Sequence, residues 1–122
     1  MENQKLRDLM NEIESVAKLD AETAATALKS LGSLLPVAGL ADRQPGFLEE
    51  TDGVLDLVNE ALPGWSVSIA GRSRDRSGAW TCTLRRSLAS DDDDYIGVGK
   101  SSKLSYAILV ALIEASMRLP AA

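Results

Sequence analysis

Residues 97–101, Gly-Val-Gly-Lys-Ser, are the residue types that end a nucleotide-binding phosphate loop. Such a loop requires Gly-x-x-x-x-Gly-Lys-Ser/Thr after a buried parallel strand, so that backbone amides and a helix N-terminus surround the phosphates. Here Asp94 occupies the first glycine position, and four aspartates replace the apolar strand. Because their charge would repel a nucleotide, we predict no bound nucleotide and no cofactor. We expect the glycine pair to let a short strand bend into a helix capped by Ser101 or Ser102.

Two acidic clusters are candidate contacts for a basic partner. Their members are Asp91, Asp92, Asp93 and Asp94 in one run, and Glu49, Glu50 and Asp52 around the start of an expected helix. A calcium loop has acids at alternate residues, a glycine and a distal glutamate, and the aspartate run lacks this spacing, so we predict no metal. Charge runs are typical of solvated turns. Alternatively, the two clusters imitate nucleic-acid phosphates toward a basic protein.

Basic residues in the second half of the chain are candidate contacts for an anion or a nucleic acid. They are Arg72, Arg74 and Arg76 in an expected hairpin loop, Arg85 nearby, and Lys100 and Lys103 before the last helix. If the loop is extended, its arginines share one polar face. The alternative is a solvated loop that Asp75 partly neutralises.

The composition disfavours catalysis. The chain has no histidine, which removes the usual proton shuttle at neutral pH and the commonest transition-metal ligand. Its single cysteine, Cys82, shares a strand face with Trp80 and Leu84, where an inert buried thiol is expected. We therefore predict that the protein is not an enzyme.

The net charge of −5 is unevenly distributed. Residues 1–62 carry five basic and twelve acidic side chains, whereas residues 63–122 carry eight and six. The acidic excess disfavours nucleic acid as a partner, although the second half could present a local basic face. One cysteine, no apolar N-terminal leader and no apolar run near the roughly 20 residues of a membrane span predict a cytoplasmic protein outside the membrane.

The first 35 residues are predicted to form a helical arm, because apolar residues recur in them at near-heptad spacing. Asp20 is the one polar residue in this pattern, and its carboxylate could cap a helix start. We therefore favour two helices, 2–18 and 21–35, over one long helix. Residues 36–46 combine two prolines and two glycines and are predicted to be a linker before a domain at 47–122. The arm must pack on that domain or form a homodimer, through its own helices or the last helix.

The domain at 47–122 is predicted to have the order α-β-β-β-α. Thr51 is expected to cap a helix that Pro63-Gly64 ends. Apolar and polar residues then alternate in 65–71 and 80–86, which predicts two half-buried strands with Trp65 and Trp80 facing the core, and a short third strand follows at 95–99. Apolar residues surround the last helix almost completely, so it must be covered on two faces. The fold class is α+β, a two-layer sandwich of three antiparallel strands on helices.

The end of the chain has two tryptophans in its expected hairpin and a regular set of alanines and isoleucines in its last helix: Trp65, Trp80, Ala107, Ile108, Ala111, Ile113 and Ala115. In these residues it resembles the phage ABA sandwich, a family of small phage and prophage domains. That family typically ends with a Trp-bearing hairpin, a strand, and a helix reading Ala-Ile-x-x-Ala-x-Leu-x-Ala. The resemblance covers residues 48–118 and implies a phage or prophage origin without an assigned catalytic activity.

The expected third strand passes into the last helix through Gly97, Gly99, Ser101 and Lys103. These residues and the order of elements are similar to those of the double-stranded RNA-binding domain, whose last helix opens with Gly-x-Gly-x-Ser-Lys-Lys-x-Ala-Lys. Here Ser102, Ser105 and Tyr106 stand where that family has Lys, Ala and Lys. Two phosphate-binding charges are therefore missing. RNA binding through Lys100, Lys103 and the loop at 72–76 is the alternative function that this similarity implies.

Together these patterns predict a non-catalytic, phage-related module that binds another protein. One form of such a module is an acidic inhibitor of host nucleic-acid or defence machinery, such as an anti-CRISPR protein or a DNA mimic. RNA binding is the alternative.

Overall fold

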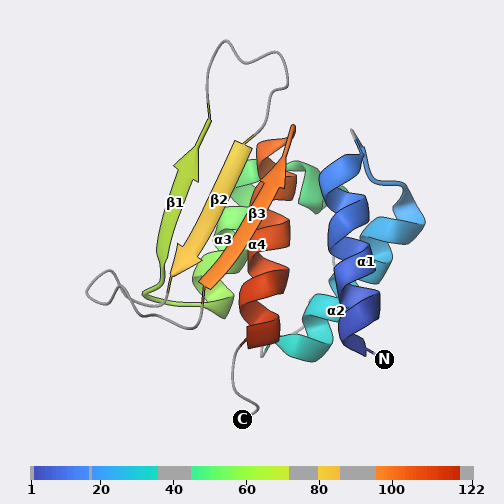
Figure 1. Ribbon diagram of the computed structural model, residues 1–122, viewed down its shortest axis with the longest axis horizontal. Coiled ribbons are helices and arrows are strands. Elements are labelled where there is room, and N and C mark those ends of the chain that lie inside the picture. The colour runs from blue at the N-terminus through green and yellow to red at the C-terminus, as the bar shows by residue number, and fades with distance from the viewer. Residues whose placement is uncertain (1, 17, 36–44, 72–79, 86–95, 119–122) are drawn as a thin grey trace.

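The order of helices and strands confirms an α+β fold (Figure 1). The structure is a computed structural model that describes residues 2–16, 18–35, 45–71, 80–85 and 96–118. Its elements are α1 (Glu2–Ser15), α2 (Ala21–Leu34), the 3-10 helix η2 (Pro45–Glu49), α3 (Thr51–Ala61), β1 (Ser66–Ala70), β2 (Trp80–Arg85), β3 (Ile96–Ser101) and α4 (Leu104–Arg118). The expected linker lies mostly outside the described residues, and its last two residues begin η2.

The three strands form one antiparallel sheet in the order β1-β2-β3, as the alternation predicts. Two rows of paired residues run across the sheet on the same face. One row joins Val67, Leu84 and Gly97, and the other joins Ile69, Cys82 and Gly99. The opposite face carries mainly serine and threonine side chains on β1 and β2. One face of the sheet is therefore apolar, and it is the face that receives a helix.

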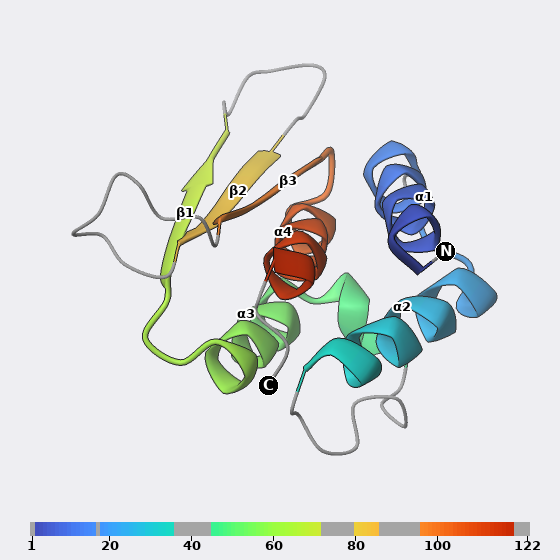
Figure 2. The same ribbon diagram turned by 60° about the horizontal axis from the view of Figure 1, so that its bottom comes forward.

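Helix α4 is the centre of the molecule. Its residues from Tyr106 to Ile113 are each at most 2% exposed, because β2 and β3 cover one side of the helix and α1, α2 and α3 contact its other sides. Figure 2 shows the sheet on one side of α4 and the remaining helices grouped around the rest of it. The expectation that the last helix is covered on two faces is confirmed.

The N-terminal residues form two helices, and Asp20 separates them. The Asp20 carboxylate accepts a hydrogen bond of 2.6 Å from the Thr23 amide, which is the cap that the sequence predicts. Buried residues of both helices, including Ile13 and Leu28, belong to the same hydrophobic core as α4. The cover that α4 needs is thus supplied within one chain.

The predicted role of the glycine pair is wrong, because both glycines lie inside β3 and not at a bend after it. Among the described residues only Gly64 has a positive φ, of 84°, and with Pro63 it follows the end of α3, whose C-cap is Leu62. The glycines are needed for close packing instead. A Cβ atom at Gly97 would lie 2.1 Å from the Ala111 carbonyl oxygen, and one at Gly99 would lie 2.0 Å from the Ala107 carbonyl oxygen.

The predicted start of α3 also differs from the structure. Thr51 is the first residue of the helix and not its cap, and the preceding Glu50 makes no side-chain hydrogen bond to the first turn. Helix α3 is stabilised mainly by tertiary packing, since Val54, Leu57 and Val58 are buried.

Candidate functional site

The residues that resemble a phosphate loop are engaged within the protein. Gly97 to Ser101 belong to a strand that pairs antiparallel with β2, so their backbone does not curve around a central point. The Lys100 amide donates a 3.0 Å hydrogen bond to the Glu14 carboxylate of α1, and the Ser101 hydroxyl accepts one of 3.1 Å from the Lys103 amide. These amides are therefore not arranged to bind a phosphate.

Only part of the predicted contact surfaces falls within the described residues. The aspartate run at 91–94 and the arginines at 72, 74 and 76 lie outside them. Glu50 and Asp52 are exposed at the start of α3, Lys100 is exposed on β3, and Arg85 is half-buried at the end of β2. Glu49 and Lys103, which the sequence assigns to opposite kinds of partner, bind each other.

The structure brings four groups together where α4 meets η2 and the junction of α1 and α2. We call them the Tyr106 cluster: the Leu19 amide, Glu49, Lys103 and Tyr106. The fully buried Tyr106 hydroxyl accepts a 2.7 Å hydrogen bond from the Leu19 amide and donates one of 2.5 Å to Glu49 Oε1. The Lys103 ammonium donates to Glu49 Oε2 and lies 5.2 Å from the centre of the Tyr106 ring. The cluster thus joins three segments that are far apart in the chain.

The pKa shifts in the Tyr106 cluster follow from these contacts. Burial raises the pKa of Tyr106 to about 12, and the hydrogen bond to the Glu49 carboxylate adds to the increase. Burial by itself would also raise the pKa of Glu49, but hydrogen bonds from Lys103 and Tyr106 outweigh it and lower that pKa. Glu49 is therefore ionised at neutral pH, with each of its oxygens accepting a hydrogen bond.

We predict that acid weakens the Tyr106 cluster. Because the pKa of Glu49 is lower in the folded state than its ordinary value of 4.5, this group stabilises the fold above that pH, and the contribution is lost as the pH falls below it. At pH 7 the free energy of unfolding of the original chain should exceed that of the Glu49→Gln variant by about 1 kcal/mol. This difference between the two proteins should be smaller at pH 3. Urea denaturation at both pH values measures this. A difference that stays constant would contradict the prediction.

The carboxylates beside the Tyr106 cluster are already hydrogen-bonded within the protein. A hollow of about 550 Å³ lies beside the Tyr106 cluster and is lined by Lys18, Leu19, Asp20, Ala21, Ala24, Gly46 and Glu49. Its carboxylates are occupied, because Asp20 accepts from the Thr23 amide and Glu49 accepts from Lys103 and Tyr106. Burial raises the pKa of the Cys82 thiol to about 11, so this residue is a poor nucleophile. Within the described ranges, no three acidic or cysteine side chains are placed to hold a metal ion.

The most distinctive exposed surface is the outer edge of β1. Of the described elements only β2 contacts β1, so the backbone groups on its other side form no sheet hydrogen bonds with a described strand. Val67 and Ile69 are 36% and 40% exposed, and they are the two large apolar side chains of the described residues that are classed as exposed. They lie on the helix-facing side of the sheet, but α4 covers only β2 and β3. The expectation that the strand at 65–71 buries its apolar face is thus only partly met.

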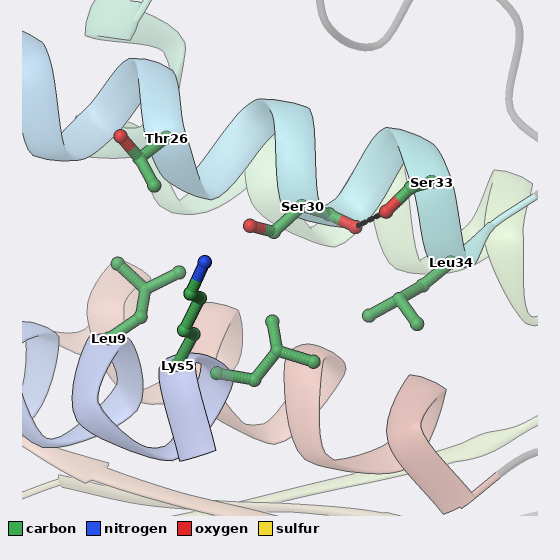
Figure 3. A pocket seen from close by; sticks show the side chains of 7 residues that line it. Lys5, Leu9, Thr26, Ser30, Ser33 and Leu34 are labelled. Atoms are coloured by element: carbon green, nitrogen blue, oxygen red, sulfur yellow. Dashed lines mark hydrogen bonds between the residues drawn. The ribbon is translucent and has the colours of Figure 1, made fainter. Parts of the chain in front are cut away.

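A groove of about 200 Å³ separates α1 from α2 (Figure 3). Leu6, Leu9 and Leu34 supply its apolar part, while Lys5, Thr26, Ser30 and Ser33 supply polar groups. The Ser33 hydroxyl donates to the Ser30 carbonyl oxygen, as the dashed line in Figure 3 shows. Small side chains on α2 therefore leave a gap beside the leucines of α1.

Filling this groove should stabilise the protein. Ser30 lies on the side of α2 that faces α1, so Ser30→Leu should contact Leu6 and Leu9 and should also favour the helix. We expect the free energy of unfolding to rise by about 1 kcal/mol in urea denaturation. The matched variant Lys29→Leu, at an exposed position of α2, should change it little. Equal effects of the two substitutions would show that the groove does not accept the side chain.

Comparisons of this chain with protein-family models, with curated proteins and with solved structures find no match. No helix in the described part of the chain is long and apolar enough to cross a membrane.

Proposed function

We propose that this protein is a non-catalytic module that binds another protein through the outer edge of β1, the edge that faces away from β2. The observation that carries the proposal is that Val67 and Ile69 are exposed on a strand whose outer edge pairs with no described strand. An extended segment can add to such an edge as a further strand: backbone hydrogen bonds provide affinity, and alternate side chains provide specificity.

The composition of β1 supports a binding role. Exposed edge strands are usually protected by charged residues, proline or a bulge, because an open edge invites association with other chains. The segment Ser66–Ala70 contains no charged residue and no proline, and it pairs with β2 without a bulge. Retaining an unprotected edge is consistent with its use as an interface.

Charge suggests a more specific form of this proposal, an acidic inhibitor. Asp52, Asp56 and Glu60 recur every four residues along α3, and all three are exposed. Together with Glu50 and the net charge of −5, they favour a partner with a basic surface. The proposed phage or prophage setting is supported by the C-terminal resemblance, and the proposed cytoplasmic location by the single, buried Cys82.

Site-specific photocrosslinking tests the proposed surface. A benzophenone side chain is placed at Ile69, on the β1 edge, and in a matched variant at Thr83, on the opposite face of the central strand. After irradiation in cells, mass spectrometry identifies the adducts. We expect one protein to be enriched at position 69 and not at position 83, and its capture should be lost on Val67→Lys. Equal labelling at both positions, or none at either, would overturn the proposal.

The structure lets the RNA-binding alternative be tested separately. The order from α3 to α4 is that of the double-stranded RNA-binding domain, but Glu49 binds Lys103 and Glu14 binds the Lys100 amide. These carboxylates oppose a polyanion at the start of α4. We therefore expect no detectable binding of a double-stranded RNA at physiological salt in a filter or anisotropy assay. Binding that weakens steeply with salt and is lost on Lys100→Glu would establish the alternative.

A further inference from the structure

The groove between α1 and α2 contains a cation without a partner in the structure. Lys5 is the one charged side chain among the described residues that line the groove, and Figure 3 shows it reaching from α1 toward α2. The Lys5 ammonium and the Ser30 hydroxyl point toward each other, but no hydrogen bond joins them. Each of these groups can therefore donate a hydrogen bond to an acceptor that lies between them.

The other hydroxyl groups of the groove already donate to the backbone of α2. Thr26 Oγ1 donates a 3.0 Å hydrogen bond to the Glu22 carbonyl oxygen, and the Ser33 hydroxyl donates one of 2.9 Å to the Ser30 carbonyl oxygen. Hydrogen bonds from an ammonium to an anion are stronger than those between neutral groups. Charge complementarity therefore favours a negatively charged group at the position between Lys5 and Ser30.

The acidic side chain near Lys5 on α1 does not occupy this position. Asp8 lies three residues from Lys5, but it does not line the groove, and its carboxylate accepts a 3.0 Å hydrogen bond from Gln4. Charges farther away than about 8 Å are largely screened by salt at physiological ionic strength. The net charge of −5 on the chain therefore does not prevent a small anion from reaching Lys5.

The rest of the groove favours a short apolar chain attached to the anion. Three leucines supply its apolar part, and one of them, Leu34, lies four residues beyond Ser30, about 6 Å along α2. A volume of about 200 Å³ has room for about seven water-sized groups of about 30 Å³ each. A carboxylate with a straight chain of about five carbons has about that number of non-hydrogen atoms.

We propose that this groove binds a short-chain monocarboxylate. The carboxylate lies between the Lys5 ammonium and the Ser30 hydroxyl, and the alkyl chain lies against the leucines of α1 and α2. The site is separate from the β1 edge, so this inference does not depend on the proposed function. The ion pair with an exposed lysine is weak by itself, and we expect a Kd for pentanoate of about 1 mM.

Titration of the isotope-labelled chain with pentanoate, followed by its amide NMR signals, tests the site. We expect saturable changes that are concentrated in α1 and α2. Pentan-1-ol has the same chain without the charge and should bind about fivefold more weakly, and pentylammonium, with the opposite charge, at least about tenfold more weakly. From acetate to pentanoate the affinity should rise about twofold to fourfold for each CH₂. It should rise little from pentanoate to octanoate, because further carbons extend into solvent.

Three variants assign the binding to this groove. Lys5→Met keeps an unbranched side chain at an exposed helical position, and it should weaken pentanoate about fivefold but leave pentan-1-ol unchanged. The matched variant Lys29→Met removes an exposed ammonium of α2 outside the groove and should leave pentanoate binding unchanged. Ser30→Leu, which should fill the groove and stabilise the fold, should abolish the saturable changes.

Several outcomes would overturn the inference. One is the absence of a saturable change with pentanoate. Another is that pentan-1-ol or pentylammonium binds as tightly as pentanoate, because Lys5 would then not select an anion. The inference also fails if either Lys5→Met or Ser30→Leu binds pentanoate as tightly as the original chain, because the ligand would then lie elsewhere.

Discussion

Replacing Gly99 with alanine is expected to lower the free energy of unfolding by about 3 kcal/mol or more, or to prevent folding altogether. The added Cβ would lie 2.0 Å from the Ala107 carbonyl oxygen and 2.6 Å from the Ala111 nitrogen. Both are backbone atoms inside α4, so they cannot rotate away as the end of a side chain can. The helix would have to move from the sheet, which would open the core on both of its sides. Urea denaturation followed by circular dichroism measures the loss.

Val98 provides a matched control for this prediction. It lies between the two glycines on the opposite face of β3 and is half-buried, so Val98→Ala removes methyl groups without approaching α4. We expect it to cost about 1 kcal/mol or less. Gly97→Ala should behave like Gly99→Ala, because its Cβ would lie 2.1 Å from the Ala111 carbonyl oxygen. If Gly99→Ala proved as stable as Val98→Ala, α4 would have to lie farther from β3 than the structure places it.

The close contact between β3 and α4 can be recognised in the sequence from the spacing of small residues. A comparison with nucleotide-binding motifs does not consider this spacing. Two residues along a strand advance about 6.7 Å, and four residues along a helix advance about 6 Å. Glycines two apart can therefore match alanines four apart when the elements run side by side. Gly97 and Gly99 do so with Ala107, Ala111 and Ala115. The sequence does not show which elements are neighbours, so the same two glycines are equally compatible with a bend after the strand.

Strand positions could be predicted, but the coverage of β1 could not. Alternation shows which side chains share a face, and the pairing of Ile69 with Cys82 confirms that prediction. It does not show how far a helix extends over that face. A helix is about 10 Å wide and strands are about 4.8 Å apart, so one helix covers about two strands. Because α4 lies over β2 and β3, no described helix covers β1.

The Tyr106 cluster could not be predicted, because its members come from distant segments. Lys103 and Glu49 each look like a surface charge in the sequence, and Tyr106 looks like one apolar residue among many in the last helix. Glu49 is 57 residues from Tyr106 in the sequence, and Leu19 is 87 residues from it. Only the tertiary structure places both beside the Tyr106 hydroxyl. The helices and the Asp20 cap, which depend on neighbouring residues, could be predicted from the sequence.

Tyr106→Phe should lower the free energy of unfolding by about 2–4 kcal/mol, with nearly the same packing volume. The change removes the acceptor of the buried Leu19 amide and the donor to Glu49 Oε1. A buried amide without a partner carries the cost of its lost hydration, and the bond to a carboxylate is stronger than one between neutral groups. Urea denaturation at pH 7 measures the loss. Glu49→Gln, which keeps an oxygen acceptor for the tyrosine, is the milder control and should cost about 1 kcal/mol.

Alkaline titration separates the hydrogen bonds of Tyr106 from its packing. Because burial and the Glu49 carboxylate raise the pKa of Tyr106 from 10.0 to about 12, its hydroxyl stabilises the fold fully below pH 10 and progressively less between pH 10 and 12. The phenylalanine variant has no such group, so the difference in stability between the two proteins should narrow over this range. A difference that persists unchanged to pH 12 would mean that the pKa of Tyr106 is the same in the folded and the unfolded chain, which contradicts the raised value. If the two proteins were instead equally stable at every pH, the contact between the N-terminal helices and α4 would depend on apolar packing and not on the hydroxyl.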